Sequence, residues 1–240
     1  MIGLPHSRRT RFAILLFALF ALIAVLPLRA VAGMLRLNEM GVAARSLRGP
    51  VWWGGADELQ IGGVRLGTVD VFLSPVQLLV GRARMDIRRQ IGQPDDIAGA
   101  VSLGWGTRGI DDVTGTLPLA AALAPLPVSS VMLEDVSARF SGDTCVHAEG
   151  RVRARMMAVI NGLSLANGLS GEARCDGDAV ELPLVSQSGM ERLVVRITAG
   201  GRLQATMHVR VNDPLISAGL AASGFRMIGG EQVLRIDSKL

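Results

Sequence analysis

The feature that most constrains this fold is a period-two alternation of apolar and polar side chains, which recurs in short runs along the chain. In residues 203–211, every second residue from Leu203 to Val211 is apolar, and those between are polar or charged. Successive side chains of a β-strand point to opposite faces of a sheet, so this spacing predicts a strand with one dry and one wet face. Similar runs occur at residues 83–88, 101–105, 146–154 and 193–197, and together they predict an all-β fold.

Short turn sequences separate these runs. Gly200 and Gly201 stand between the runs 193–197 and 203–211, and glycine supplies the positive φ angles that tight hairpins need. Such turns recur at short intervals, whereas parallel strands need crossover connections of a dozen or more residues. The sequence therefore predicts a curved antiparallel β-sheet meander, or alternatively a two-sheet sandwich.

Few helices are expected beyond the N-terminal segment. Residues 75–80 and 156–161 are short candidates, and residues 214–222 are the clearest, because Asp213 or Asn212 can cap a helix that starts at a proline. Residues 117–127 are rich in proline and alanine. We interpret them as a crossing between two sheets, with a boundary between two small domains as the alternative.

An uncharged segment at residues 12–28 follows Arg8, Arg9 and Arg11. Its 17 residues are at the short end of the length with which a helix spans a bilayer. Arginines before such a segment favour a cytoplasmic N-terminus. We therefore expect a cytoplasmic tail at 1–11, a transmembrane anchor at 12–32 and an exported β-rich domain at 33–240. A cleaved signal peptide is the alternative, because residues 30–32 (Ala-Val-Ala) have the form of a signal-peptidase site.

The charge of the exported part excludes one class of partner. Of the 25 basic residues, four lie before residue 33, where there is no acidic residue, so the remainder carries equal numbers of both signs. A nucleic-acid-binding domain would instead show an excess of basic residues, because its affinity comes from phosphate contacts. We expect no nucleic-acid partner.

Cys145 and Cys175 are the only cysteines, and both follow the apolar segment. In an oxidising compartment we expect them to form one disulfide, which the chain-entropy model values at about 3–4 kcal/mol. Two buried free thiols or a redox pair are alternatives, although no CxxC spacing supports the latter. A zinc site is unsupported because His147 is the only histidine near either cysteine.

The sequence offers no reaction chemistry. His147 and His208 lie on the polar sides of their runs, beside charged residues, where a solvated histidine is expected. There is no HExxH motif, phosphate-binding loop or zinc spacing. We therefore predict a protein without catalytic activity, and expect no cofactor and no metal.

Three motifs occur in a fixed order between residues 46 and 82: S-x-x-G-x-V-W-x-G-x-A, then G-G-x-x-L-G, then L-S-P-x-x-L-L-x-G-R. The second half adds the cysteine pair, a P-L-x-S-x-S-G segment at residues 183–189 and a G-F pair at 224–225. With the N-terminal apolar segment and the length, this order resembles the type II secretion system protein N family over nearly the whole chain. The motif residues are Ser46, Gly49, Val51, Trp52, Gly54, Ala56, Gly62, Gly63, Leu66, Gly67, Leu73, Ser74, Pro75, Leu78, Leu79, Gly81 and Arg82.

The resemblance implies a bitopic, single-pass protein of the cell inner membrane with most of its chain in the periplasm. It further implies a non-enzymatic accessory role in type II protein secretion. The implied partners are other inner-membrane proteins of that system or the outer-membrane secretin.

The best candidate interaction residues are Arg45, Trp52 and Trp53, in a glycine-rich segment close to the anchor. Tryptophan and arginine often dominate interface energies. Adjacent residues of a strand point to opposite faces, so we expect one tryptophan outside the core, with both inside a sandwich as the alternative. In a second hypothesis, an AsmA-like sheet binds lipid or another hydrophobic ligand through Trp52, Trp53, Phe72 and Trp105.

Overall fold

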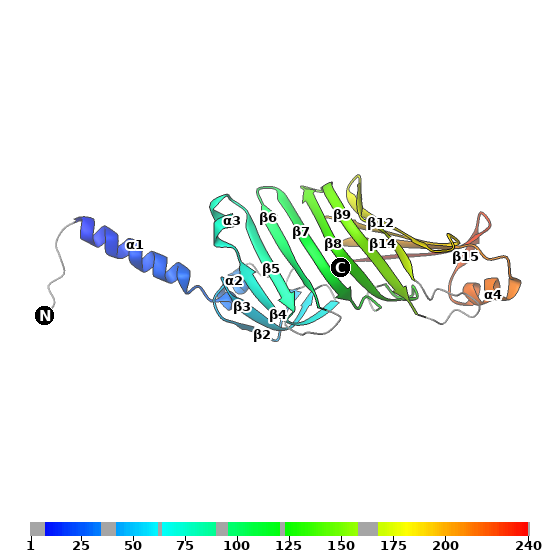
Figure 1. Ribbon diagram of the computed structural model, residues 1–240, viewed down its shortest axis with the longest axis horizontal. Helices are drawn as coiled ribbons and strands as arrows, with labels where there is room; N and C mark the ends of the chain where they lie inside the picture. Colours follow the sequence, from blue (N-terminus) through cyan, green and yellow to red (C-terminus); the bar gives the residue numbers. More distant parts are fainter. Residues whose placement is uncertain are drawn as a thin grey trace.

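In the computed structural model, the strands among the described residues form a single antiparallel β-sheet, which follows two N-terminal helices (Figure 1). The structure describes residues 8–34, 42–61, 64–89, 96–120, 123–157 and 168–239. The helices are α1 (Arg8–Ala24), α2 (Leu28–Met34), α3 (Pro75–Leu79) and α4 (Pro214–Ala222). The strands are β1 (Val42–Ala43), β2 (Ser46–Arg48), β3 (Gly54–Ile61), β4 (Val64–Leu73), β5 (Ala83–Arg89), β6 (Ala98–Gly104), β7 (Thr107–Leu117), β8 (Val128–Ser141), β9 (Thr144–Met156), β10 (Leu169–Glu172), β11 (Arg174–Asp176), β12 (Ala179–Ser186), β13 (Glu191–Thr198), β14 (Arg202–Val209), β15 (Arg226–Ile228) and β16 (Glu231–Lys239).

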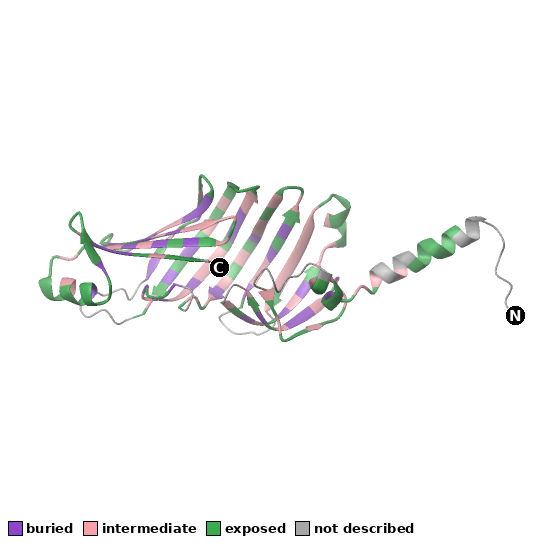
Figure 2. Ribbon diagram, turned by 180° about the vertical axis from the view of Figure 1, so that it is seen from behind, coloured by how far each residue is buried: buried purple, intermediate pink, exposed green. Residues whose placement is uncertain are grey.

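Most strands pair with their neighbours in the chain. The order in the sheet is β1-β3-β4-β5-β6-β7-β8-β9-β10-β12-β13-β14-β16-β15, with β2 on β3 and β11 on β12. The sheet curves along its length, so β5–β9 and β14–β16 run in different directions in Figures 1 and 2. The meander prediction is confirmed, and the sandwich alternative is wrong.

The strand predicted from the clearest alternation is confirmed as β14. Leu203, Ala205, Met207 and Val209 are buried, whereas Gln204 is exposed. The expected hairpin is also present: Val195 of β13 lies opposite Ala205, and Gly201 in the turn has φ +78°. Here the period-two pattern coincides with burial because one side of the strand packs into the core.

Residues 117–127 do not cross between sheets. They connect β7 to β8, and these two strands pair directly, with Leu117 opposite Val131. Within this connection Leu123 and Leu126 are buried in the core. The proline-rich composition interrupts the strand, but its leucines pack back onto the same sheet, so neither a second sheet nor a domain boundary forms.

Two of the three expected helices are confirmed. Residues 75–79 form α3, and α4 begins at Pro214, where the Asp213 carboxylate accepts a hydrogen bond from the Leu215 amide at 2.8 Å. The third was expected at residues 156–161. Met156 instead ends β9, and residues 158–161 lie outside the described residues.

Two clusters of buried apolar side chains stabilise the sheet by removing their surface from water. The main cluster joins β8–β14, β16 and α4, and the N-terminal cluster joins β3, β4 and the segment after α1. Fully buried members of the main cluster are Leu126, Val128, Val152, Leu169, Leu184, Leu193, Met207, Val209 and Leu220. The buried members of the N-terminal cluster are Leu28, Val51, Ala56, Leu59, Leu66, Val69, Val71 and Ile97.

Strand β6 keeps the predicted alternation but is buried on the other side. Ala100 and Ser102 are buried, whereas Val101 is 36% and Leu103 52% exposed. On the buried face, Arg82 donates a hydrogen bond to Ser102 at 3.2 Å and Ala100 lies opposite Asp111, whereas the face of Val101 and Leu103 is partly open to solvent. Trp105, expected on the same strand, lies in the following turn and is 92% exposed.

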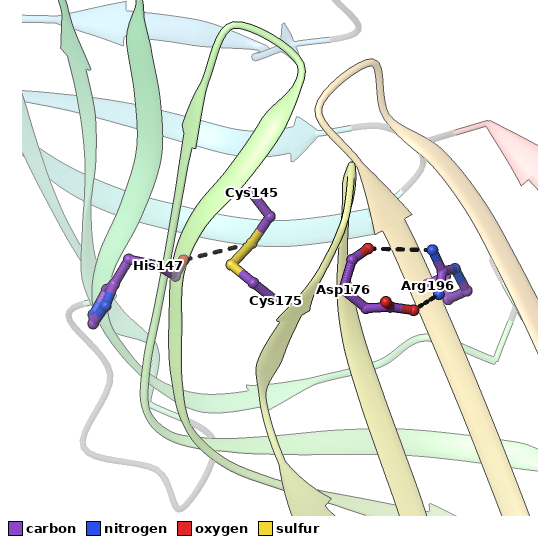
Figure 3. Close-up of a disulfide and its surroundings, with 5 residues drawn as sticks. All are labelled: Cys145, His147, Cys175, Asp176 and Arg196. Atoms are coloured by element: carbon purple, nitrogen blue, oxygen red, sulfur yellow. Dashed lines mark hydrogen bonds and ion pairs between the residues drawn. A yellow bond between two sulfur atoms is a disulfide. The ribbon is translucent and has the colours of Figure 1, made fainter.

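The predicted disulfide is confirmed. Cys145, at the start of β9, is joined to Cys175 of β11, and their Cα atoms lie 5.5 Å apart (Figure 3). On the opposite side of β11, Asp176 forms an ion pair with Arg196 of β13. Strand β11 pairs with β12 in the sheet. The disulfide therefore links this short strand to the β8–β9 hairpin as well.

Candidate interaction surface

The chain that follows α1 is fastened to the β2–β3 turn. The Leu28 amide donates a hydrogen bond to the Gly49 carbonyl at 3.0 Å, and the Val51 amide donates one to the Leu26 carbonyl at 2.8 Å. Pro27 and Pro50 form a β-bridge between these bonds. Leu28 and Val51 are both buried in the N-terminal cluster. Residues 26–28 and 49–51 together form what we call the clamp, which joins α1 to the sheet.

Two glycines make the clamp geometrically feasible. Gly49 has φ +76°, a conformation that other residues adopt only with strain. Gly54 leaves no room for a side chain, since a Cβ there would lie 2.7 Å from the Arg48 carbonyl oxygen and 2.9 Å from Leu28 Cδ2. The turn therefore closes tightly enough for Leu28 to pack against it.

A pocket of about 450 Å³ lies beside the clamp, between the end of α1 and the β2–β3 turn. Most of its surface is apolar, and one of its lining residues, Arg29, is charged. Its lining residues are Ala24, Val25, Pro27, Arg29, Leu47, Gly49, Pro50 and Trp53. The arrangement suits an apolar group more than a reacting substrate.

The two adjacent tryptophans have different surroundings. Trp52 packs against the N-terminal cluster, whereas Trp53 is 67% exposed and lines the pocket. The expected separation of the two is present, but its cause differs from the prediction. Residues 51–53 form a turn, so the turn geometry and not strand alternation sends the side chains apart.

Arg45 precedes β2, at the end of the β2–β3 hairpin that lies away from this turn. Its Nη1 atom is 2.9 Å from Glu58 Oε1, and both side chains are well exposed. Beside it, Arg48 Nη2 lies 2.7 Å from Asp57 Oδ1, and the Ser46 hydroxyl donates to Asp57 Oδ2 at 2.5 Å. Exposed pairs of this kind contribute about 0–1 kcal/mol to stability, so these charges are available for a partner.

A second polar group lies on β5–β8, around Asp111. Arg82 Nη2 is 2.9 Å from Asp111 Oδ2, and Arg139 Nη2 is 3.1 Å from Asp111 Oδ1. Burial alone would raise the pKa of the Asp111 carboxyl. Hydrogen bonds from Ser102 and Arg139 and the charge of Arg82 outweigh it, so the pKa lies below its ordinary value. This group stabilises the polar face of the sheet and leaves no carboxyl poised for acid–base chemistry.

The remaining candidates are dispersed. His147 pairs with Glu149 at 3.2 Å and His208 with Glu231 at 3.0 Å. Within the part of the chain that the structure describes, no three His, Cys, Asp or Glu side chains are grouped to hold a metal ion. The four aromatic residues of the lipid hypothesis do not form one group: Trp52 and Trp53 lie in the β2–β3 turn, Phe72 on β4 and Trp105 in the β6–β7 turn. Phe72 is opposite Asp86, on the polar face, and not with Met85 on the apolar one.

Two residues of the first motif, Gly49 and Val51, lie in the clamp: Gly49 has a positive φ and Val51 is buried. Residues 40–234 match the family model described as type II secretion system (T2SS), protein N. The chain belongs to the type II secretion system protein N family. Neither the curated proteins nor the solved structures contain a match to it. The resemblance inferred from the sequence is thus confirmed. The protein is a component of the type II secretion system.

Several positions of the protein N motifs have a physical reason in this structure. Val51 and Ala56 are buried in the N-terminal cluster, Gly49 and Gly54 permit the clamp, and Gly67 has φ +76°. The sequence did not single out residues 26–28 as part of the domain. They continue an apolar segment, and nothing in their order signals that this segment turns back onto the sheet.

Proposed function

We propose that this protein is a non-enzymatic component of the type II secretion machinery, anchored in the inner membrane by its N-terminal segment. Its β-sheet domain lies in the periplasm and supports the assembly or function of the machinery through protein contacts. In this proposal residues 1–11 are cytoplasmic, 12–32 form the anchor and 33–240 the periplasmic domain. The family membership is the single observation that carries the proposal.

The exposure of α1 supports the anchor. Phe12, Leu15 and Phe17 are 66%, 68% and 74% exposed, and the helix extends away from the sheet (Figure 1). Transfer of such large, exposed apolar side chains from water into a hydrocarbon environment is favourable and lowers the free energy. Among the helices that the structure describes, none combines the length and the apolar composition that a membrane crossing requires.

The clamp supports an anchor that is retained over a signal peptide that is removed. Cleavage after Ala32 would remove Leu26 and Leu28, and with them both hydrogen bonds of the clamp and a buried side chain of the N-terminal cluster. An apolar side chain of this kind contributes about 2–5 kcal/mol when buried. Retention therefore keeps the domain intact and holds it against the membrane.

Trp53 and Arg45 supply the best surface for a protein partner. Trp53 is exposed beside an apolar pocket, and Arg45 adds an exposed guanidinium on the same β2–β3 unit. A partner that fills the pocket would bury the indole at the centre of the contact, where truncation of tryptophan costs about 2 kcal/mol or more.

Photo-crosslinking in cells tests this proposal. A photoreactive amino acid at position 53 of the membrane-anchored chain should crosslink to inner-membrane proteins of the secretion system or to the secretin. The same amino acid at Leu215, an exposed residue of α4, is the matched control and should give far less product. Crosslinking from position 215 alone, or to no secretion protein from either position, contradicts the assignment of this surface.

Topology is tested separately. A reporter that is active only in the cytoplasm, fused after residue 240, should be silent, because the arginines that precede the apolar segment favour a cytoplasmic N-terminus. The mature chain should also retain residues 12–32 when its mass is measured. An active reporter, or a mass that begins after Ala32, contradicts the anchored topology.

A second candidate function, binding of a lipid or another hydrophobic ligand by an AsmA-like sheet, is favoured by the partly open apolar face of β6. Val101 and Leu103 are exposed there, and Met85 and Ile110 lie beside Val101 in register. Native mass spectrometry of the purified chain should then reveal a bound lipid that the Leu103→Ser variant loses. A ligand-free wild-type protein excludes this function.

A further inference from the structure

The inference concerns the outer edge of β16, the last strand of the chain. Strand β15 pairs with residues 231–233 of β16 and with no later ones. The chain that precedes β15 turns away from the edge, because the Phe225 amide donates a hydrogen bond to the Leu220 carbonyl at 3.1 Å. Among the described residues, no backbone hydrogen bond reaches residues 234–238 from the side opposite β14. We call residues 234–238 the free edge.

The free edge is regular and unprotected. The pairing of β16 with β14 continues without a bulge from Gln232 to Lys239. Natural sheets protect exposed edges with prolines, bulges or charges on the dry face, because unpaired N–H and C=O groups otherwise bind another strand. The free edge has no proline, and its residues on the side of the main cluster, Leu234, Ile236 and Ser238, carry no charge. At the other end of the sheet, β1 and β2 both pair with β3 and cover it.

Two arginines beside the free edge indicate which strand would bind there. Arg226 of β15 lies opposite Val233, and Arg235 follows Val233 by two residues, so both arginines are on the same face of the sheet. Both are exposed, and neither forms an ion pair within the part of the chain that the structure describes. In an added strand, the residue opposite Arg235 would lie two positions beyond Arg226 along the same edge. An acidic residue there would be next to both arginines, and opposite charges on facing strands stabilise a sheet.

The carboxylates on this face already have partners. Glu231 Oε2 lies 3.0 Å from His208 Nδ1, and Glu231 Oε1 accepts a hydrogen bond from Arg210 at 2.5 Å. Asp237 Oδ2 lies 2.6 Å from Arg202 Nη2. The hydrogen bonds from Arg210 and Arg202 lower the pKa values of the two carboxyls, which therefore stay ionised and paired at neutral pH. The charge left without a partner at the free edge is thus positive.

A second copy of this chain does not fit the free edge. Two copies paired about Ile236 would set Lys239 of one copy opposite Val233 of the other. Arg226 already occupies that position, and pairing about an earlier residue increases the overlap. Pairing about Asp237 would set two aspartates directly opposite each other, which destabilises a sheet. A shift by one residue would join the dry face of one copy to the wet face of the other.

We propose that the free edge binds an extended acidic segment of a partner protein as an additional antiparallel strand. Main-chain hydrogen bonds to residues 234–238 hold this strand, and side chains at alternate positions select it. An acidic residue lies opposite Arg235, and an apolar residue opposite Ile236 extends the main cluster, against which Ile236 packs. The free edge begins beside α4 and β15, at the end of the sheet away from α1 (Figure 1). It is thus a second protein contact, which depends neither on the anchor nor on the pocket beside Trp53.

Peptide binding to the full chain in detergent micelles tests the proposal. The probe is a fluorescein-labelled peptide, T-V-T-V-E-V, whose glutamate is placed to lie opposite Arg235, and its fluorescence anisotropy reports binding. Alternate amides of a strand point to opposite edges. Of two peptides N-methylated at one or the other alternate set of residues, we therefore expect only one to lose binding.

A charge exchange tests the acidic position. Lysine in place of the peptide glutamate should weaken binding by about two- to five-fold, and Arg235→Glu should restore it. The matched control is Arg192→Glu, which reverses an exposed arginine on the same face of β13, away from the edge, and should leave the affinity for the glutamate peptide unchanged.

Each outcome decides one part of the proposal. If the unmethylated peptide does not bind, or both N-methylated peptides bind as well as it does, no strand is added at the free edge. If Arg235→Glu still prefers the glutamate peptide, the acidic partner is wrong. If light scattering shows a wild-type dimer that Arg235→Glu converts to a monomer, the occupant is a second copy of the chain and the proposed partner is wrong. None of these results changes what is expected of crosslinking from position 53.

Discussion

Leu28 lies directly over Gly54: a Cβ at Gly54 would come within 2.9 Å of Leu28 Cδ2. Leu28 lies in the segment after α1, and Gly54 is the first residue of β3. Their contact helps to couple the N-terminal helix to the sheet. Backbone oxygens of Arg48 and Pro50 lie equally close to the same point, at 2.7 and 2.9 Å.

The first prediction follows from this contact. Gly54→Ala should lower the free energy of unfolding by about 1–3 kcal/mol, because the added methyl group overlaps backbone atoms that cannot move independently. Gly55→Ala is the matched control, since its nearest neighbour, the Val69 carbonyl oxygen, is 3.6 Å away. Denaturant titration of the three proteins measures the difference. Equal stability of both variants contradicts the role assigned to Gly54.

The second prediction concerns the disulfide between Cys145 and Cys175. Replacing both residues with alanine should destabilise the domain by about 3–4 kcal/mol, because the bond closes a long loop in the unfolded chain. The sequence separation of the two cysteines is 30 residues. Thermal unfolding with and without reductant measures the loss, and reductant should not affect the double variant. Two reactive thiols in the denatured, non-reduced wild type would show that the bond is absent.

The third prediction uses the pH dependence of Asp111. Its pKa is lowered in the folded state, so its stabilising effect is present above the unfolded value of about 3.9 and is lost as the pH falls through the folded value. Asp111→Asn should therefore cost about 1–3 kcal/mol near neutral pH and progressively less below about pH 4.

The control for Asp111 is Asp143→Asn, which removes a pair with Arg108 whose carboxylate is 93% exposed. Its effect on the free energy of unfolding should stay below about 1 kcal/mol at any pH. Urea titrations at several pH values compare the two variants. A loss for Asp111→Asn that is constant with pH would show that the carboxylate charge is not what stabilises this part of the sheet.

The fourth prediction separates the two tryptophans of the β2–β3 turn. Trp52→Ala should reduce stability by about 2–4 kcal/mol, because the side chain packs against the N-terminal cluster. Trp53→Ala should change stability by less than about 1 kcal/mol and reduce secretion of a native substrate, because the indole is exposed beside the pocket. Secretion and unfolding are measured on the same variants. If secretion by Trp53→Ala falls only in proportion to its stability, position 53 is not an interface.

The class of fold and several local elements could be predicted from the amino-acid sequence alone. Alternation over residues 203–211 predicted β14, because side chains of a strand project to opposite faces wherever that strand lies. The cap at Asp213 and the proline at 214 predicted α4, because both act within one helical turn. The paired cysteines and the ordered motifs indicated the disulfide and the family without any knowledge of the chain path.

Which faces are buried and which distant segments meet depends instead on how the whole chain folds. Val101 and Leu103 are exposed while Ala100 and Ser102 are buried, since burial depends on what covers each face of the sheet, and periodicity carries no information on that cover. The prolines of residues 117–127 could not distinguish a crossing from a loop that packs back. Leu28 meets Gly54, and Trp105 meets Gly81, through the folding of segments that are more than 20 residues apart in the chain. Contacts of this kind arise from packing in three dimensions, and local sequence patterns do not encode them.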